Sequence, residues 1–165
     1  MYNEDTVDKF EEDVYPWVVF KISKSLYTVK SNLINSIVVL PENITKIPNV
    51  PNYILGLIQL RGNVIPLTDL RLLFNMKAIR EENNDLILDE KKMQNKEMVI
   101  VIEIDNSFMG ILVDEVLSVE KITILEETEE IKKMGKDVYI KGIAKGNKKN
   151  DVLLIIDEEK IMNMV

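Results

Sequence analysis

The side chains that most often carry out enzymatic chemistry are missing from this 165-residue sequence. It contains no His and no Cys, which removes histidine general bases, thiolate nucleophiles, disulfides and the usual zinc ligands. It also lacks a Gly- and Lys-containing phosphate loop and a Gly-x-Ser-x-Gly nucleophile motif. Only carboxylates and lysines remain for catalysis, so we expect the protein not to be an enzyme.

The many carboxylates do not suggest a metal site. Most of them stand in runs such as "REENND" and "EETEE", which are typical of solvated loops. Asp114 and Glu115 follow an apolar segment and could bind a cation. A lone acidic pair, however, supplies too few ligands for calcium, and no calcium-loop spacing is present. We therefore expect no metal and no cofactor.

A single cation stands out in the stretch "QLRGNVIPLTDLR", from Gln59 to Arg71. Apolar residues lead into Arg61 and out again after Gly62. Gly62 supplies a permissive backbone for a turn between two strands. Arg61 is then either a solvated hairpin residue or a charge held out for a partner.

Composition limits the class of partner. The net charge is −7 and the pI is about 4.8, which disfavours binding to a nucleic-acid backbone. No apolar run approaches the roughly 18 residues of a membrane span, and the acidic N-terminus does not resemble a signal peptide. We expect a cytoplasmic protein.

The elements that must position these residues are mostly short strands. In the first half "WVVFKI", "SLYTVK" and "LINSIVVL" have strand character, and "YILGLIQL" with "VIPLTDL" predicts a hairpin. In the second half "MVIVIEI", "FMGILVDEV" and "VEKITIL" predict strands, and "VYIKGIAKG" with "DVLLIID" a second hairpin. Short helices are expected at "LRLLFNM", capped by Asp69, in "EETEEIKKMG", and at "EEKIMNM".

An internal repeat accompanies these elements. "YILGLIQ" at Tyr53 matches "YIKGIAK" at Tyr139, and each is followed by an apolar segment that ends in an acid, Asp69 or Asp157. Many short strands with a weak repeat favour two small packed β-barrels. The expected organisation is an acidic flexible tail (1–16) and one domain (17–165), divided into a first subdomain (17–76), a linking loop (77–97), a second subdomain (98–157) and a C-terminal helix (158–164).

The segment "LINSIVVL" does not follow simple alternation, so both of its faces are expected to be covered. Two interpretations remain open. The segment is buried between the two lobes, or Ile34 or Ile37 faces a partner.

The run "P-x-Y-I-x-G-x-x-x-L-R-G-x-x-I-P-x-x-D-L-R", from Pro51 to Arg71, resembles the CheW family of bacterial chemotaxis coupling proteins. "VVFKI", "LYTV", "MGILVDEVLSV" and "YIKGIAK" extend the resemblance over nearly the whole chain. The family implies a mainly β fold of two five-stranded SH3-like barrels. It also implies a scaffold that joins the regulatory domain of the histidine kinase CheA to chemoreceptor hairpin tips in membrane-associated arrays.

The resemblance also assigns residues. It implies receptor binding by Arg61, Ile34, Ile37 and Met98, kinase binding by Leu40 and Ile44, and structural turns at Gly56, Gly62 and Asp69. The family often has a Glu between its two apolar receptor positions, where this chain has Ser36. Arg61 must therefore pair with another acid or stay solvated.

The alternative function is a small β-barrel that binds a ligand or nucleic acid. Against it stand the acidic net charge and the single Trp, which leave little surface for base stacking.

Overall fold

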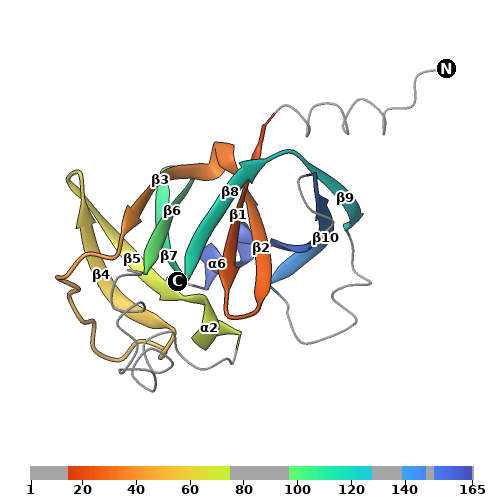
Figure 1. Ribbon diagram of the computed structural model, residues 1–165. Helices are drawn as coiled ribbons and strands as arrows, with labels where there is room; N and C mark the ends of the chain where they lie inside the picture. The colour runs from red at the N-terminus through yellow and green to blue at the C-terminus, as the bar shows by residue number, and fades with distance from the viewer. Residues whose placement is uncertain (1–14, 75–96, 128–138, 148–150, 165) are drawn as a thin grey trace, which may run out of the picture.

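The computed structural model describes residues 15–74, 97–127, 139–147 and 151–164. Almost all of the acidic tail and of the expected linking loop lies outside these residues, as does most of the expected helical turn after Leu125. The described residues form two antiparallel-rich sheets and a few short helices (Figure 1).

The larger sheet has six strands in the order β8-β1-β2-β11-β10-β9. Their bounds are β1 Trp17–Ile22, β2 Ser25–Lys30, β8 Glu115–Glu120, β9 Ile122–Glu127, β10 Ile140–Gly146 and β11 Val152–Ile156. The smaller sheet has five strands in the order β3-β6-β7-β5-β4. Their bounds are β3 Ile34–Val39, β4 Ile54–Leu60, β5 Asn63–Asp69, β6 Met98–Ile104 and β7 Ser107–Val113. The mainly β, two-sheet fold is as expected, although one sheet has six strands where five were expected.

Each sheet draws strands from both halves of the chain. The N-terminal hairpin β1–β2 joins β8 to β11, and the hairpin β6–β7 joins β3 to β5, so red and blue strands share one sheet in Figure 1. Sequential subdomains at 17–76 and 98–157 would have kept these strands apart. The two halves therefore interlock, because each completes its sheet with a hairpin from the other.

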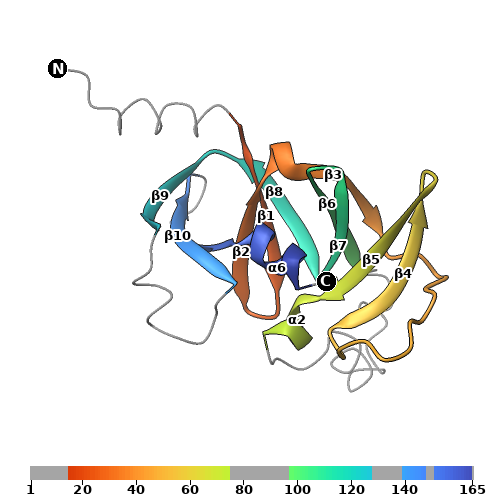
Figure 2. The same ribbon diagram turned by 180° about the vertical axis from the view of Figure 1, so that it is seen from behind.

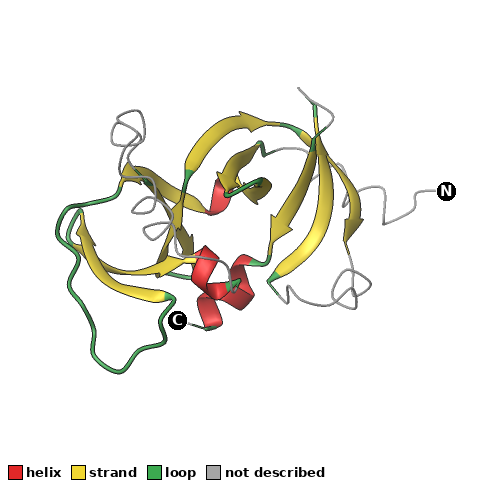
Figure 3. Ribbon diagram, turned by 60° about the horizontal axis from the view of Figure 1, so that its bottom comes forward, coloured by secondary structure: helices red, strands yellow, loops and turns green. Residues whose placement is uncertain are grey.

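The internal repeat corresponds to two equivalent hairpin–helix units. In one, β4 and β5 pair antiparallel, β5 lies parallel to β7, and helix α2 (Leu70–Leu73) follows. In the other, β10 and β11 pair antiparallel, β11 lies parallel to β2, and helix α6 (Glu158–Asn163) follows. Figure 2 shows α2 and α6 at the junction of the two sheets, and Figure 3 shows the helices gathered there from below.

The repeated tyrosines connect the two units reciprocally. The hydroxyl of Tyr53 lies 3.5 Å from the carbonyl oxygen of Met164, at the end of α6. The ring of Tyr139 packs against Phe74, at the end of α2, with 5.9 Å between ring centroids. Each tyrosine therefore contacts the helix that belongs to the other unit.

Three apolar clusters form the core of the described part of the chain. One lies between the sheets and includes Phe20, Tyr27, Ile100 and residues of both helices. The second belongs to the five-stranded sheet and the third to the six-stranded sheet. Strand β1 shows why its sequence is almost continuously apolar. Val18, Phe20 and Ile22 face the inter-sheet cluster, whereas Trp17 and Val19 face the cluster of their own sheet, so both faces are covered.

The two glycines of the first hairpin have different roles. Gly62 lies in the β4–β5 turn with φ +80°, as expected. Gly56 was also expected at a turn, but it lies inside β4, at an irregularity in the pairing with β5. Its φ is +146°, and a Cβ there would lie 2.3 Å from the carbonyl oxygen of Thr45. The constraint on Gly56 is thus the close approach of a second backbone.

Candidate protein-binding surfaces

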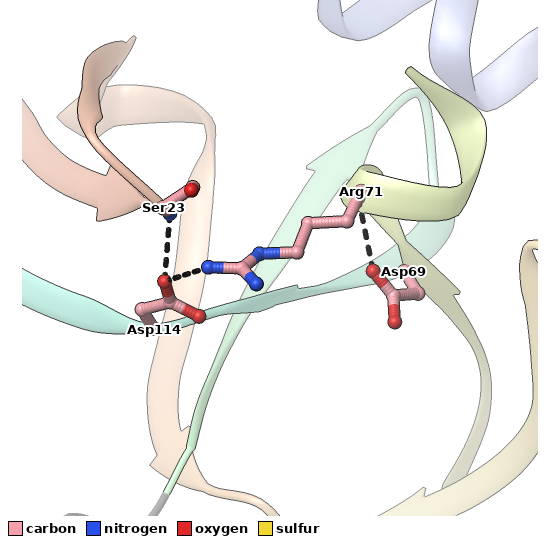
Figure 4. A network of polar contacts seen from close by, with 4 residues as sticks. All are labelled: Ser23, Asp69, Arg71 and Asp114. Atoms are coloured by element: carbon pink, nitrogen blue, oxygen red, sulfur yellow. Dashed lines mark hydrogen bonds and ion pairs between the residues drawn. The ribbon is translucent and has the colours of Figure 1, made fainter. Parts of the chain in front are cut away.

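A buried polar network joins α2 to the β1–β2 turn of the six-stranded sheet, away from the Arg61 turn. The guanidinium of Arg71 forms an ion pair with Asp114, directly after β7 (Figure 4). The same carboxylate oxygen of Asp114 accepts the backbone N–H of Ser23 at 2.7 Å. Asp114, considered from the sequence as a possible cation ligand, thus binds a cation supplied by the chain itself. This network is structural, because Arg71 is buried.

Asp69 belongs to the same region and caps α2. Its Oδ1 accepts the backbone N–H of Arg71 at 2.9 Å, as the sequence predicted. Its Oδ2 is buried and has no hydrogen-bond partner among the described residues. Burial raises the pKa of Asp69, and the N–H groups of Arg71 and Leu72 and the charge of Arg71 oppose that rise.

Arg61 lies at the tip of the β4–β5 hairpin. Leu60 pairs with Asn63, so Arg61 and Gly62 form a two-residue turn, with φ +49° and +80°. Positive φ at both central residues is the requirement of a type I′ turn. The side chain of Arg61 is exposed and forms no ion pair with another described residue. Among the described residues, no acid thus takes the place of the family's Glu as a partner of Arg61.

Two of the expected receptor-binding residues, Ile34 and Ile37, lie on β3 at the opposite edge of that sheet from β4, and Met98 begins the neighbouring strand β6. Strand β3 is an edge strand, paired only with β6. Ile34 pairs with Ile102 and Ile37 with Ile100. Residues three apart normally point to opposite faces of a strand. An irregularity between Ile34 and Ser36 shifts the alternation by one, so Ile34 and Ile37 share a face.

That face borders the inter-sheet core and is only partly buried. Ile34, Ile37 and Met98 all pack against the inter-sheet cluster, and so does Val116 of β8, the edge strand of the other sheet. We call these four residues the inter-sheet stripe. Ser36 pairs with Val101, which belongs to the cluster of the five-stranded sheet. Ser36 therefore points away from the stripe, and the stripe is apolar on its β3 side.

The expected kinase-binding residues occupy another place. Leu40 and Ile44 are partly buried against the cluster of the five-stranded sheet. The backbone N–H of Leu40 donates to the carbonyl oxygen of Glu97 at 2.9 Å. The structure thus separates three groups of expected site residues, which are the inter-sheet stripe, the Leu40–Ile44 region and the Arg61 turn.

Comparison with known proteins identifies the family. A family model described as a CheW-like domain matches residues 16–165. The chain belongs to the CheW family. This is a family of chemotaxis adaptors, and the match favours the coupling-protein expectation over a barrel that binds a ligand or nucleic acid. Within the described residues, no helix is long and apolar enough to cross a membrane.

Individual CheW proteins agree with this assignment. The chemotaxis protein CheW of Bacillus subtilis (strain 168) is 30% identical over 149 residues, which is 88% of this chain and 85% of the relative. The CheW of Helicobacter pylori is 40% identical over 75 residues, and the match spans only 44% of that protein's length. The crystal structure of the scaffolding protein TtCheW from Thermoanaerobacter tengcongensis has a TM-score of 0.63 at 26% identity and covers 86% of this chain and 88% of its own.

Two residues of these surfaces were missed by sequence reasoning. Arg71 was read only as part of the "D-L-R" motif, and Val116 was not singled out. The available signal was that Arg71 stands within the apolar run "LTDLRLLF". A cation buried in such a run requires an anion nearby. The position of Val116 depends on how the two sheets meet, and no local pattern reports that.

Proposed function

We propose that this chain links chemoreceptor hairpin tips to the histidine kinase CheA within membrane-associated signalling arrays. The observation that carries the proposal is the inter-sheet stripe. Its apolar side chains come from the edge strands β3 and β8 and from the start of β6, and they remain partly exposed. Such a stripe is suited to the apolar face of a helical hairpin, which binds through anchors one helical turn apart.

The kinase contact is assigned to a separate surface, the region of Leu40 and Ile44. Separation matters because a scaffold must hold both partners at once. It can transmit a change in receptor state only if its contact free energy differs between the two states. Pairwise affinities in the micromolar range suffice, since assembly into an array raises the effective concentration of each partner.

We assign Arg61 to the receptor side on the family resemblance, as a second contact separate from the inter-sheet stripe. It is exposed and unpaired within the described residues, so it can form a charge-assisted hydrogen bond with a receptor carboxylate at little desolvation cost. Replacing Arg61 with Glu is therefore expected to weaken receptor binding and to leave the fold intact.

The test is an NMR titration of the ¹⁵N-labelled chain with two fragments added separately, a receptor hairpin tip and the regulatory domain of a CheA-type kinase. The receptor fragment should shift the amides of Ile34, Ile37 and Met98, and the kinase domain those of Leu40 and Ile44. The absence of shift changes with both fragments, or shift changes on one shared surface for both, would contradict the proposal.

A matched pair of variants tests the proposed receptor contact further. Ile37→Thr keeps a β-branched side chain in β3 but removes apolar contact area. It should lower the receptor affinity about tenfold, as expected for an anchor residue. Leu125→Thr is the control, because Leu125 is 55% exposed on β9, at the far edge of the other sheet. Equal loss of receptor binding in both variants would argue against the stripe.

A further inference from the structure

The two hairpin–helix units allow one half of the chain to be compared with the other. Asp69 caps α2 and Asp157 caps α6, each through its side chain. The second residue of each helix is therefore equivalent, and these residues are Arg71 and Glu159. A buried cation in one unit thus corresponds to an exposed anion in the other.

The hairpin turns beside these two residues are alike as well. Ser23 begins the β1–β2 turn and Asp105 the β6–β7 turn, and both have positive φ, 57° and 49°. In the first unit the guanidinium of Arg71 binds Asp114, whose carboxylate also accepts the N–H of Ser23 (Figure 4). The chain thus fills the space between α2 and the β1–β2 turn with its own arginine.

The equivalent space in the second unit is open among the described residues. A pocket of about 460 Å³ lies between α6 and the β6–β7 turn. Asp105 and Glu159 supply carboxylates to its lining, no basic residue lines it, and its apolar walls include Pro66, Ile104, Phe108 and Met162. The inter-sheet stripe does not contribute to it.

We propose that this pocket accepts an arginine side chain presented by a partner protein. Two carboxylates match the charge and the donor fork of a guanidinium, and the ring of Phe108 offers a surface for stacking. The apolar walls suit the methylene groups of the arginine stem. The first unit provides the internal precedent, because there the guanidinium of Arg71 binds a carboxylate, that of Asp114, beside the β1–β2 turn. The proposal goes beyond the proposed function and does not depend on it.

The test uses the full ¹⁵N-labelled chain and a defined probe, N-acetyl-L-arginine N-methylamide. The citrulline derivative is the control, because it has nearly the same shape without the charge. The arginine probe should shift the amides of Asp105, Ser107 and Glu159, with a dissociation constant on the order of millimolar for so small a ligand. The citrulline probe should bind at least about tenfold more weakly. Equal binding of both probes, the absence of shifts, or shifts on another surface would overturn the proposal.

Variants locate the site. Glu159→Gln and Asp105→Asn each remove one charge from an exposed side chain, so the fold should persist, and each should lower the arginine affinity about threefold or more. Glu115→Gln is the matched control, since Glu115 is an exposed acid on β8 outside the pocket. Unchanged affinity in Glu159→Gln and Asp105→Asn, or an equal loss in the control, would overturn the assignment.

Discussion

Arg71 of α2 and Asp114 after β7 form an ion pair across 43 positions of the chain. The side chain of Arg71 is 3% exposed and that of Asp114 is 25% exposed. Asp114 also accepts the N–H of Ser23, so the pair connects the helix of one sheet to a hairpin turn of the other. The interlocked halves of the chain are thus held together by polar contacts as well as by the inter-sheet core.

The ion pair should contribute asymmetrically to stability. Asp114→Ala removes the carboxylate that forms an ion pair with the buried guanidinium of Arg71, and it should lower the free energy of unfolding by about 3 kcal/mol. Arg71→Met should lower the free energy of unfolding less. In that variant the carboxylate of Asp114 still accepts the hydrogen bond from the N–H of Ser23 and remains partly exposed to water. Urea unfolding measures both variants, with Glu115→Ala as a surface control. Equal losses in the two single variants, or strictly additive losses in the double variant, would contradict this account.

Gly56 and Gly62 should respond differently to the same substitution. A Cβ at Gly56 would collide with the backbone of Thr45, so Gly56→Ala should cost about 3 kcal/mol or more. A Cβ at Gly62 meets nothing within 4 Å, so Gly62→Ala should cost only the left-handed backbone strain of about 1–2 kcal/mol. Thermal or urea unfolding of both variants provides the comparison. A larger loss at Gly62 than at Gly56 would show that the turn, and not the close approach, is the critical point.

The sequence predicted the local elements well, because their signals are local. Apolar runs predicted most of the strands, the Arg61–Gly62 pair predicted the hairpin turn, and Asp69 predicted the cap of α2. The prediction of "FMGILVDEV" as one strand was wrong, because the segment is divided at Asp114 between β7 and β8, which lie in different sheets. The repeat of Tyr53 and Tyr139 predicted two equivalent units. It did not show that each tyrosine contacts the helix of the other unit, since that depends on how the sheets interlock.

The candidate surfaces were less predictable for the same physical reason. The shared face of Ile34 and Ile37 depends on a shift of alternation between Ile34 and Ser36, which has no distinctive sequence signal. The Arg71–Asp114 pair joins segments from the two halves of the chain. Such segments come together because each of the hairpins β1–β2 and β6–β7 pairs with strands from the other half of the chain. The alternation of residues along a strand does not show which distant strand it pairs with.

Asp69 should make stability depend on pH. Its native pKa is raised by burial above the ordinary value of 3.8. Below that value both the native and the unfolded state carry the proton. As the pH rises from there through the higher native pKa, the unfolded chain releases its proton first, so stability is lost over this window. Asp69→Asn cannot ionise and should not show this loss.

The measurement is urea unfolding of the parent and of Asp69→Asn at about pH 4 and at about pH 7. The stability of the parent relative to the variant should be greater at the lower pH. Asp157→Asn, at the equivalent cap of α6, controls for exchanging a cap carboxylate for an amide. If the relative stability of the parent rises with pH instead, the hydrogen bonds to Asp69 determine its native pKa more than its burial does.

Arg61 should show a conflict between stability and partner binding. Its φ of +49° strains an arginine but suits an asparagine, and Asn-Gly is the preferred pair for a type I′ turn. Arg61→Asn should therefore raise the free energy of unfolding by about 0.5–1 kcal/mol. Under the proposed function it should also weaken binding to a receptor hairpin tip, because the cation is lost.

The two measurements separate the possible roles of Arg61. Urea unfolding measures how Arg61 affects the stability of the turn, and titration with the receptor fragment measures how it affects receptor binding. A more stable variant with unchanged receptor affinity would mean that Arg61 is only a solvated turn residue. A less stable variant would mean that the arginine supports the hairpin itself. Increased stability together with weaker binding would show that a strained turn is retained because it presents a charge to the receptor.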